Sequence, residues 1–121
     1  RPDLPTLGAV AEARGLRGTC VVSRETVEPG SGTHCRVFVP HFGVPEDIVT
    51  GSVHSPMGLW LAEAGALLLA AGRAAFTAEQ GDTLGRPGRL RVEVEGAGGA
   101  APKVRVGGSA VTVLSGSLRL P

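Results

Sequence analysis

The segment at residues 45–52 holds the side chains best suited to chemistry. An acidic pair that ends at Asp47 precedes Thr50, Gly51 and Ser52, and a helical pattern begins immediately afterwards. The first N–H groups of a helix have no partners within the helix, and the helix dipole adds about half a positive charge there. Gly51 permits close approach of a ligand, and the two hydroxyls add donors. The segment is therefore a candidate cradle for a carboxylate, with Asp47 a candidate for orienting a substrate group or transferring a proton.

The same residues also have a purely structural interpretation. Thr50 or Ser52 can serve as a simple N-cap, and Glu46 and Asp47 then favour the helix start electrostatically. His54 would stand on the first turn of the helix, where a protonated ring adds positive charge near a bound anion; alternatively it faces solvent or an interface. Residue types alone do not decide between the binding and the capping interpretation.

The elements before this segment are predicted from local patterns. A short amphipathic helix is predicted over residues 4–14, after Asp3 as N-cap. Residues 18–23 and 35–39 have the β-branched and alternating patterns of strands, and a turn at 28–32 makes them candidate neighbours. Proline and glycine interrupt residues 40–51, so a loop is expected there.

The elements after it begin with a helix. Apolar residues from Val53 to Leu68 recur every three or four positions, and the most apolar stretch, 59–72, is interpreted as a core helix. A long turn is expected at 81–88. Strands are predicted at 89–95, 104–106 and 111–114, forming a three-stranded meander. Glycine-rich turns at 96–101 and 107–108 separate them.

Composition narrows the class of protein. The chain has 121 residues, enough for one domain, with a formal net charge of +1 and only four aromatic residues (one Trp and three Phe). Nucleic acid is therefore not an expected partner. The most apolar stretch is shorter than the ~20 residues of a bilayer span, so no membrane segment is expected. Nothing in the sequence indicates export, and a cytoplasmic location is expected.

Cysteine and histidine usage gives no sign of a metal centre. Cys20 and Cys35 are expected to be free core thiols. Together with His34 and His41 they lack the ligand spacing of a zinc site, so no metal is expected. A nucleophile elbow of the form Gly-x-Ser-x-Gly is also missing from the sequence, which gives hydrolysis through a covalent intermediate no support.

Several short motifs resemble one known family. In order, the chain carries CRVFVP at 35–40, FGV at 42–44, PED at 45–47, TGS at 50–52, QG at 80–81, GRPGRL at 85–90 and VRVGGSAV at 104–111. This series is similar to the second-lobe signature of the PhzF-like (phenazine-biosynthesis-like) family, from about residue 17 to the end. Ile48 and Val53 depart from the family pattern, which often has proline and alanine there.

The resemblance implies an α+β fold of the diaminopimelate-epimerase-like type. Such proteins have two similar lobes, each a mixed, curled sheet wrapped around a central helix, with a cofactor-independent active site between them. The N-termini of the two central helices hold the acidic groups of the substrate. Residues 1–121 would then form a single C-terminal lobe, and the first lobe is absent from this chain.

The resemblance also implies roles for individual residues. Asp47 would contact substrate and relay protons, and Thr50, Gly51, Ser52 and His54 would bind it. The family's main acid/base is a glutamate of the first lobe, so we expect this chain to act as an isomerase or epimerase on a small carboxylate only beside such a lobe. That lobe would be a separate chain or a cleaved part of the same one.

Two other hypotheses remain open at this stage. The chain could be a non-catalytic module that binds small carboxylates and pairs with itself as a homodimer, since the family's two lobes are similar in shape. It could also be a stable fragment of a longer enzyme with no independent role.

Overall fold

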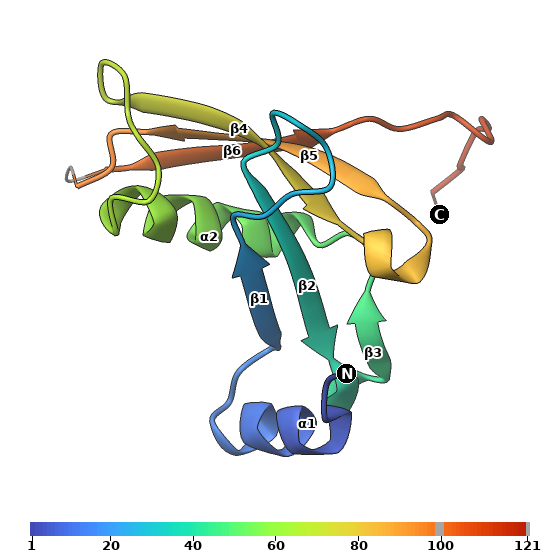
Figure 1. The fold of residues 1–121 in the computed structure, drawn as a ribbon. Coiled ribbons are helices and arrows are strands. Elements are labelled where there is room, and N and C mark those ends of the chain that lie inside the picture. Colours follow the sequence, from blue (N-terminus) through green and yellow to red (C-terminus); the bar gives the residue numbers. More distant parts are fainter. Residues whose placement is uncertain (99–100, 121) are drawn as a thin grey trace.

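The computed structural model describes residues 1–98 and 101–120. Figure 1 shows their strands joined into one mixed sheet, which confirms the predicted α+β class. In chain order the elements are α1 (Leu4–Ala13), β1 (Thr19–Ser23), β2 (Thr33–Val39), the 3-10 turn η1 (Pro40–Phe42), β3 (Val44–Asp47), α2 (Gly51–Glu63), β4 (Arg73–Gln80), the 3-10 turn η2 (Asp82–Leu84), β5 (Gly88–Glu95) and β6 (Lys103–Gly108). Gly99 and Ala100 of the turn predicted at 96–101 lie outside the described residues.

Helix α1 forms where the sequence predicts it. Asp3 caps its start by accepting a hydrogen bond from the Thr6 N–H at 3.1 Å, and this bond lowers the pKa of the Asp3 carboxyl. The helix packs against η1, where Gly8 approaches the ring of Pro40. Figure 1 shows α1 at the end of the molecule remote from β4, β5 and β6.

The first two strands also follow the prediction. β1 and β2 pair antiparallel, with Cys20 opposite Val37 and Val22 opposite Cys35. The loop expected at residues 40–51 is more ordered than the sequence indicates, since it contains η1 and the short strand β3. β3 pairs with β2 through Asp47 opposite Val37, which fixes the start of the candidate site against the sheet.

Strand β4 is an element that the local pattern does not predict. It runs parallel to β2, with Cys35 opposite Gln80, and antiparallel to β5 along its whole length. The sheet order is β1-β2-β4-β5-β6, with β3 paired to β2. A meander does exist, but its strands are β4, β5 and β6.

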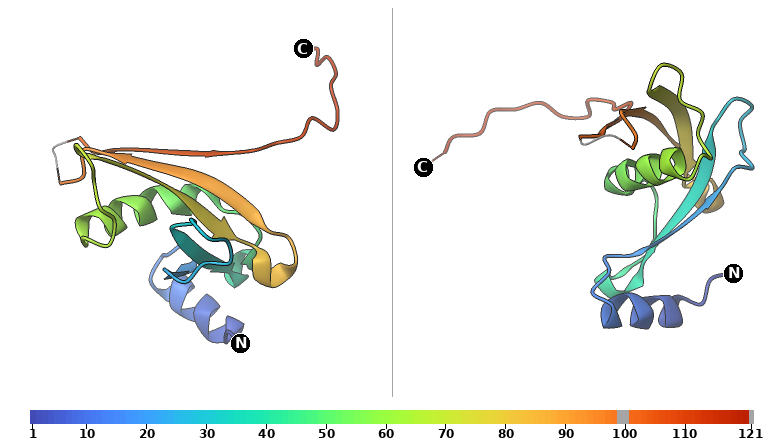
Figure 2. Two further views of the ribbon diagram at one scale, coloured as in Figure 1. Left: turned by 45° about the horizontal axis from the view of Figure 1, so that its top comes forward. Right: turned by 90° about the vertical axis from the view of Figure 1, so that its left-hand side faces the viewer.

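The strand predicted at residues 111–114 is wrong. No strand is assigned in residues 109–120, called here the C-terminal segment, and Val111 and Val113 are 86% and 91% exposed. Both figures show this segment leaving the sheet after β6 (Figures 1 and 2). An alternating apolar pattern favours a strand, but a strand also requires hydrogen-bonded pairing, and this segment pairs with no strand among the described residues, although β6 ends the strand order beside it.

Helix α2 is shorter than predicted. It ends at Glu63, and the chain then turns through Gly65 at a φ of 69°, a conformation that glycine adopts easily. Leu68, which the periodic pattern placed on the buried face, is instead 91% exposed. In the apolar run at 59–72, residues 59–63 are thus helical and the longer part, 64–72, lies outside the helix.

The core lies between α2 and the sheet. Met57, Gly58 and Leu61 are buried, and a Cβ added at Gly58 would lie 2.9 Å from Val92, so this glycine lets α2 approach β5 closely. Figure 2 shows β4 to β6 along one side of α2 and β1 and β2 along another. The mixed sheet and central helix are therefore confirmed, but the sheet stays open rather than curling around the helix.

Two further predictions concern the state of the cysteines and the presence of a membrane-spanning helix. Cys20 and Cys35 are free thiols, as expected. Within residues 1–98 and 101–120, no helix has the length and apolar character needed to cross a bilayer.

Candidate functional site

The candidate site forms where β3 ends and α2 begins, over residues 47–54, called here the motif segment. Thr50 occupies the N-cap position, yet its side chain caps nothing. Its hydroxyl instead donates to Asp47 Oδ2 at 2.6 Å. Thr50 is therefore the N-cap residue, as one of the two capping alternatives predicted, but its side chain makes no capping hydrogen bond, and Ser52 lies within α2. The hydroxyl proton of Thr50 is committed to Asp47 and is not free for a ligand.

Gln80 holds the motif segment from the end of β4. Its side chain is fully buried and makes three hydrogen bonds to the segment. Oε1 accepts from the Thr50 N–H at 3.0 Å, while Nε2 donates to the Asp47 carbonyl at 2.8 Å and to Thr50 Oγ1 at 3.0 Å. The loop between β3 and α2 is thus fixed by a residue from another strand. In the sequence, Gln80 belongs to the QG motif at 80–81, which contributed to the family resemblance but gave no sign of this supporting role.

Gly81 brings the same turn close to the motif segment. Its φ is 91°, and an added Cβ would lie 2.7 Å from the Ile48 carbonyl oxygen. A side chain here would meet both backbone strain and a backbone atom. Gln80 and Gly81 therefore act together as the support of the loop.

His54 lies inside the core rather than on an open face. It is fully buried; Nδ1 lies 2.8 Å from the Thr50 carbonyl oxygen and Nε2 lies 3.6 Å from Cys35 Sγ. Because a carbonyl only accepts, Nδ1 carries the proton, and Nε2 can accept from the thiol. Burial lowers the pKa of His54, partly offset by the Thr50 carbonyl. The ring is neutral, and both nitrogens have protein partners.

The thiol beside His54 is also held in the protonated form. Cys35 is buried with Sγ 3.7 Å from Gln80 Oε1, and its neighbour Cys20 and burial both raise its pKa. Cys35 is therefore a packing partner of the His54 ring and of Gln80, not a nucleophile.

The two acidic residues of the PED motif have different partners. Glu46 accepts two bonds from Arg36, at 2.9 and 2.8 Å, and one from Thr83 at 2.9 Å. Arg36 lowers the pKa of Glu46, so this carboxylate is ionised and anchored. Asp47 bonds only through Oδ2 within the described residues, so Oδ1 is available to a ligand.

The start of α2 presents its free donors to solvent. Gly51 and Ser52 are exposed, and in the described part of the chain their backbone N–H groups and the Ser52 hydroxyl have no acceptor. An added Cβ at Gly51 would meet nothing within 4 Å, so the approach to these groups is open. Gly51 and Ser52 thus lie at the surface, and the partly buried Asp47 is linked to this helix start through its hydrogen bond from Thr50.

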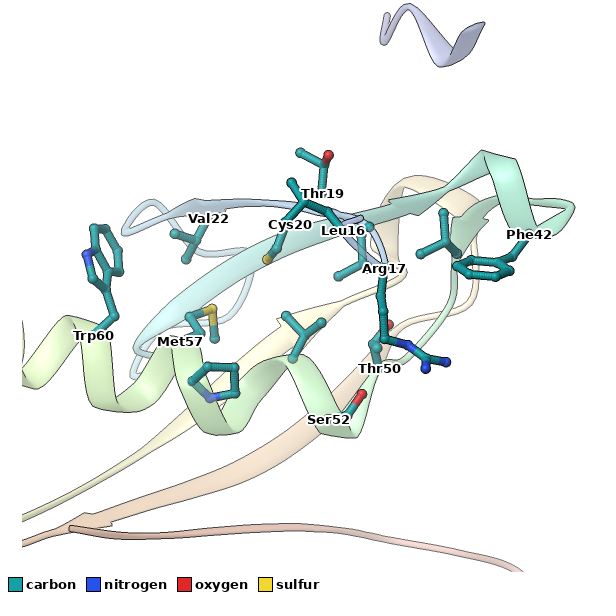
Figure 3. A pocket seen from close by; sticks show the side chains of 15 residues that line it. Leu16, Arg17, Thr19, Cys20, Val22, Phe42, Thr50, Ser52, Met57 and Trp60 are labelled. Carbon is teal, nitrogen blue, oxygen red and sulfur yellow. The ribbon is translucent and has the colours of Figure 1, made fainter. Parts of the chain in front are cut away.

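A cavity of about 840 Å³ lies between the start of β1 and α2. Thr50 and Ser52 line one end of it, and Figure 3 shows Arg17 extending toward these two residues while Trp60 stands at the opposite end. The walls between the ends are apolar, from Cys20, Val22 and Met57 among others. Sequence reasoning did not identify Arg17, which lies 33 positions or more before the residues it faces and belongs to none of the quoted motifs.

No group of three or more potential metal ligands occurs among residues 1–98 and 101–120. The histidines and cysteines considered for a metal have other partners. His34 lies 3.6 Å from Asp82, His41 lies 3.1 Å from the Leu16 carbonyl oxygen, and Cys35 contacts His54.

Comparison with known proteins gives the same family as the motifs. The family model described as phenazine biosynthesis-like protein (PhzC-PhzF) matches residues 2–116. An uncharacterised isomerase of Deinococcus radiodurans is 38% identical over 115 residues, which cover 95% of this chain and 36% of the relative. The trans-2,3-dihydro-3-hydroxyanthranilate isomerase of Pseudomonas aeruginosa is 34% identical over 89 residues, covering 72% of this chain and 31% of the relative.

A solved structure supports the fold. The phenazine biosynthesis protein of the PhzF family from Bacillus anthracis superimposes with a TM-score of 0.67 at 24% identity, covering 78% of this chain and 32% of that one. This chain belongs to the PhzF-like (phenazine biosynthesis-like) family. It spans about a third of the length of the curated relatives named here, 36% and 31%.

Proposed function

We propose that this chain is the C-terminal lobe of a cofactor-independent isomerase or epimerase that moves a proton on a small carboxylate substrate. A first lobe, on a separate chain or on the remainder of the same polypeptide, completes the active site. The observation that carries the proposal is the exposed start of α2 beside an acid fixed in position. The free N–H groups of Gly51 and Ser52 directly follow Thr50 in the chain, and the Thr50 hydroxyl bonds to Asp47 Oδ2 at 2.6 Å.

The start of α2 supplies binding for the substrate anion. Its N–H groups and the positive end of the helix dipole stabilise a carboxylate without adding a side-chain base. Because Thr50 donates to Oδ2 of Asp47, Oδ1 can accept a bond from a hydroxyl or amino group of the substrate. Asp47 then orients the substrate and takes part in the proton relay.

Catalysis is assigned to the assembled protein rather than to this chain alone. Glu46 is held by Arg36 and Thr83, and no glutamate or aspartate, Asp47 included, is among the described residues that line the cavity beside α2. A second acid or base is therefore expected from the first lobe. His54 acts as a positioning residue, since its buried ring supports the Thr50 carbonyl from inside the core.

A fusion protein tests the proposal. The first two thirds of the Deinococcus radiodurans relative would be joined to this chain and incubated in D₂O with trans-2,3-dihydro-3-hydroxyanthranilate, on which the Pseudomonas relative acts by its name. Mass spectrometry is expected to find deuterium in the product. Asp47→Asn, which keeps the shape of the side chain, should slow exchange by about 10²-fold or more, because it removes a proton-transfer group.

The matched control is Glu12→Gln, a charge change on the exposed face of α1 that should leave the exchange rate unchanged. Equal exchange rates for Asp47→Asn and the unmodified fusion would contradict the role of Asp47. Exchange by the 121-residue chain alone would contradict the need for a first lobe.

A further inference from the structure

The chain holds two cysteines, and the sheet places them next to each other. In the antiparallel pair of β1 and β2, Cys35 lies opposite Val22, two positions along β1 from Cys20. Opposite residues share a face of the sheet, and so do side chains two positions apart along a strand. The two thiols are therefore diagonal neighbours on the face of the sheet that packs against α2.

Solvent reaches the two thiols unequally. Cys20 is half-buried and lines the cavity beside α2, whereas Cys35 is 1% exposed. Figure 3 shows the Cys20 side chain pointing from β1 toward α2, into this cavity. A small oxidant that enters the cavity therefore meets Cys20 and not Cys35.

The contact between the thiols makes Cys20 the more reactive of the two. Contact with the Cys35 thiol lowers the pKa of Cys20 by more than burial raises it, while the same contact and burial raise the pKa of Cys35. The thiolate is the form of cysteine that peroxides oxidise. A thiol of lowered pKa that solvent can reach, with a second thiol beside it, is the usual arrangement of a redox-sensing cysteine.

We infer that Cys20 and Cys35 are a modification site, at which a peroxide oxidises Cys20 and Cys35 then closes a disulfide with it. This chemistry goes beyond the proposed function, since it needs neither the substrate nor a first lobe. In the first step the thiolate sulfur of Cys20 attacks one oxygen of the peroxide and the O–O bond breaks. Cys20 becomes a sulfenic acid, and the released hydroxide takes up a proton to form water.

The second step uses a partner of Cys35 in the core. Cys35 Sγ attacks the sulfur of the sulfenic acid, the S–S bond forms as the S–O bond breaks, and the hydroxyl group leaves as water. The proton for this water comes from Cys35, and the unprotonated Nε2 of His54, 3.6 Å from Cys35 Sγ, can accept it on the way. In total the two thiols lose two electrons and two protons, and one hydrogen peroxide becomes two waters.

Strand β1 is placed to adjust to the bridge. Diagonal neighbours in a sheet are roughly 7–8 Å apart, whereas the Cα atoms of a disulfide are usually about 4.4–6.8 Å apart. Among the described strands β1 pairs only with β2, at one end of the strand order, so it can shift along β2 without breaking a second ladder. A bridge that requires such a shift is readily reduced again, as a reversible modification requires.

The disulfide would also affect the support of the motif segment. Cys35 Sγ lies 3.6 Å from His54 Nε2 and 3.7 Å from Gln80 Oε1, so its S–H proton is within reach of both acceptors. A disulfide sulfur carries no proton. Oxidation therefore removes a donor from the two residues whose side chains bond to the backbone of Thr50.

Peptide mapping of the 121-residue chain tests the inference. Trypsin cleaves after arginine, which places Cys20 on the peptide 18–24 and Cys35 on the peptide 25–36. The chain would be treated with hydrogen peroxide, alkylated with iodoacetamide and digested without reductant. Mass spectrometry is expected to find the two peptides joined, with a mass two hydrogen atoms below their sum, and dithiothreitol should separate them.

Two variants separate the roles of the cysteines. Cys35→Ser keeps a hydroxyl donor beside Cys20, so oxidation should stop at the sulfenic acid, which dimedone captures on the peptide 18–24. Cys20→Ser should leave Cys35 reduced under the same treatment. In the unmodified chain, iodoacetamide should alkylate Cys20 at least about tenfold faster than Cys35. Thermal unfolding of each variant checks that the fold is retained.

Hydrogen–deuterium exchange measures the effect on the motif segment. Amide exchange in residues 47–54 should become faster in the disulfide form and return to its original rate after reduction. Exchange in β6, at the opposite end of the strand order from β1, should stay the same. Unchanged exchange in residues 47–54 would contradict the link between the cysteine pair and the motif segment.

Three results would overturn the modification site itself: no joined peptides after peroxide treatment, a bridge between the Cys20 residues of two copies of the chain as the main product, or equal alkylation rates for Cys20 and Cys35. None of them depends on a first lobe or on turnover. A fusion protein that fails to exchange deuterium would therefore count against the proposed isomerase function alone.

Discussion

The motif segment and the C-terminal segment carry equally clear sequence patterns but have opposite surroundings in the structure. The motif segment is held by Gln80 through three hydrogen bonds and by the buried ring of His54. The C-terminal segment presents Val111 and Val113 to solvent and pairs with no strand among the described residues.

The difference shows what a local pattern requires before it becomes structure. Backbone groups and apolar side chains adopt an ordered arrangement when partners offset the loss of conformational entropy. The motif segment finds these partners within the same 121 residues, in β2 and β4. The C-terminal segment has the alternation of a strand, but it pairs with no strand in the described part of the chain and its side chains stay exposed.

The largest expected effect comes from removing the support of the motif segment. Gln80→Leu leaves the Thr50 N–H and the Asp47 carbonyl without their partner in a buried setting, so the free energy of unfolding should fall by about 2–4 kcal/mol. Urea denaturation followed by Trp60 fluorescence measures it. If Gln80→Leu lowers the free energy of unfolding by less than about 0.5 kcal/mol, Gln80 does not hold the motif segment, and the proposed difference from the C-terminal segment is contradicted.

A pH effect of intermediate size is expected from His54. Burial lowers its pKa in the folded state below the unfolded value of about 6.5, so below that pH the unfolded chain binds a proton that the folded chain does not. Stability should therefore fall as the pH decreases below about 6.5, by at most about 1.4 kcal/mol per pH unit from this group, until the pH passes the folded pKa.

His54→Gln should flatten this pH dependence between pH 7.5 and 5.5, whereas His41→Gln, at a partly exposed histidine, should keep it. The measurement is the urea midpoint at a series of pH values. The same slope in the unmodified chain and in His54→Gln would contradict a buried neutral ring.

The smallest effect is expected in the C-terminal segment. Val113→Ser should change the free energy of unfolding of this chain by less than about 0.5 kcal/mol, because the side chain contacts solvent. Val92→Ser is the matched control, since Val92 is fully buried in β5 and the change removes apolar contacts and buries a hydroxyl; it should cost at least about 2 kcal/mol. A cost of that size in Val113→Ser would mean that the segment packs against the chain in solution.

Sequence reasoning predicted the elements that depend on neighbouring residues. The Asp3 cap identified α1, and the alternation at 35–39 identified β2, because both signals lie within a few residues. β4 contains three alanines and no strong alternation, and its position depends on pairing with β2 and β5 far along the chain. The end of α2 was missed because the apolar spacing continues past Gly65 into a loop.

The residues of the candidate site also fall into two groups: some have a signal within a few neighbouring residues, and others depend on contacts between distant parts of the chain. Asp47, Gly51 and Ser52 stay a prediction from one short segment, and the structure confirms only that this segment spans the start of a helix. Gln80 lies 30 residues after Thr50, and Arg17 precedes the segment by about as far, so their contacts depend on the sheet. His54 could be found by its place in the segment, but its direction into the core required the packing of α2 on β2.

The parallel pairing of β2 with β4 has a consequence for the order in which the molecule assembles. Asp47 and Thr50 leave the ribosome before Gln80 does, and Gln80 follows Thr50 by 30 positions, a stretch that includes all of α2. The loop between β3 and α2 therefore cannot acquire its final conformation while it is being synthesised. This loop depends on the pairing of β2 with β4, and non-local pairing of this kind slows folding. The ability to bind a ligand at the start of α2 should therefore be among the last properties that the nascent chain gains.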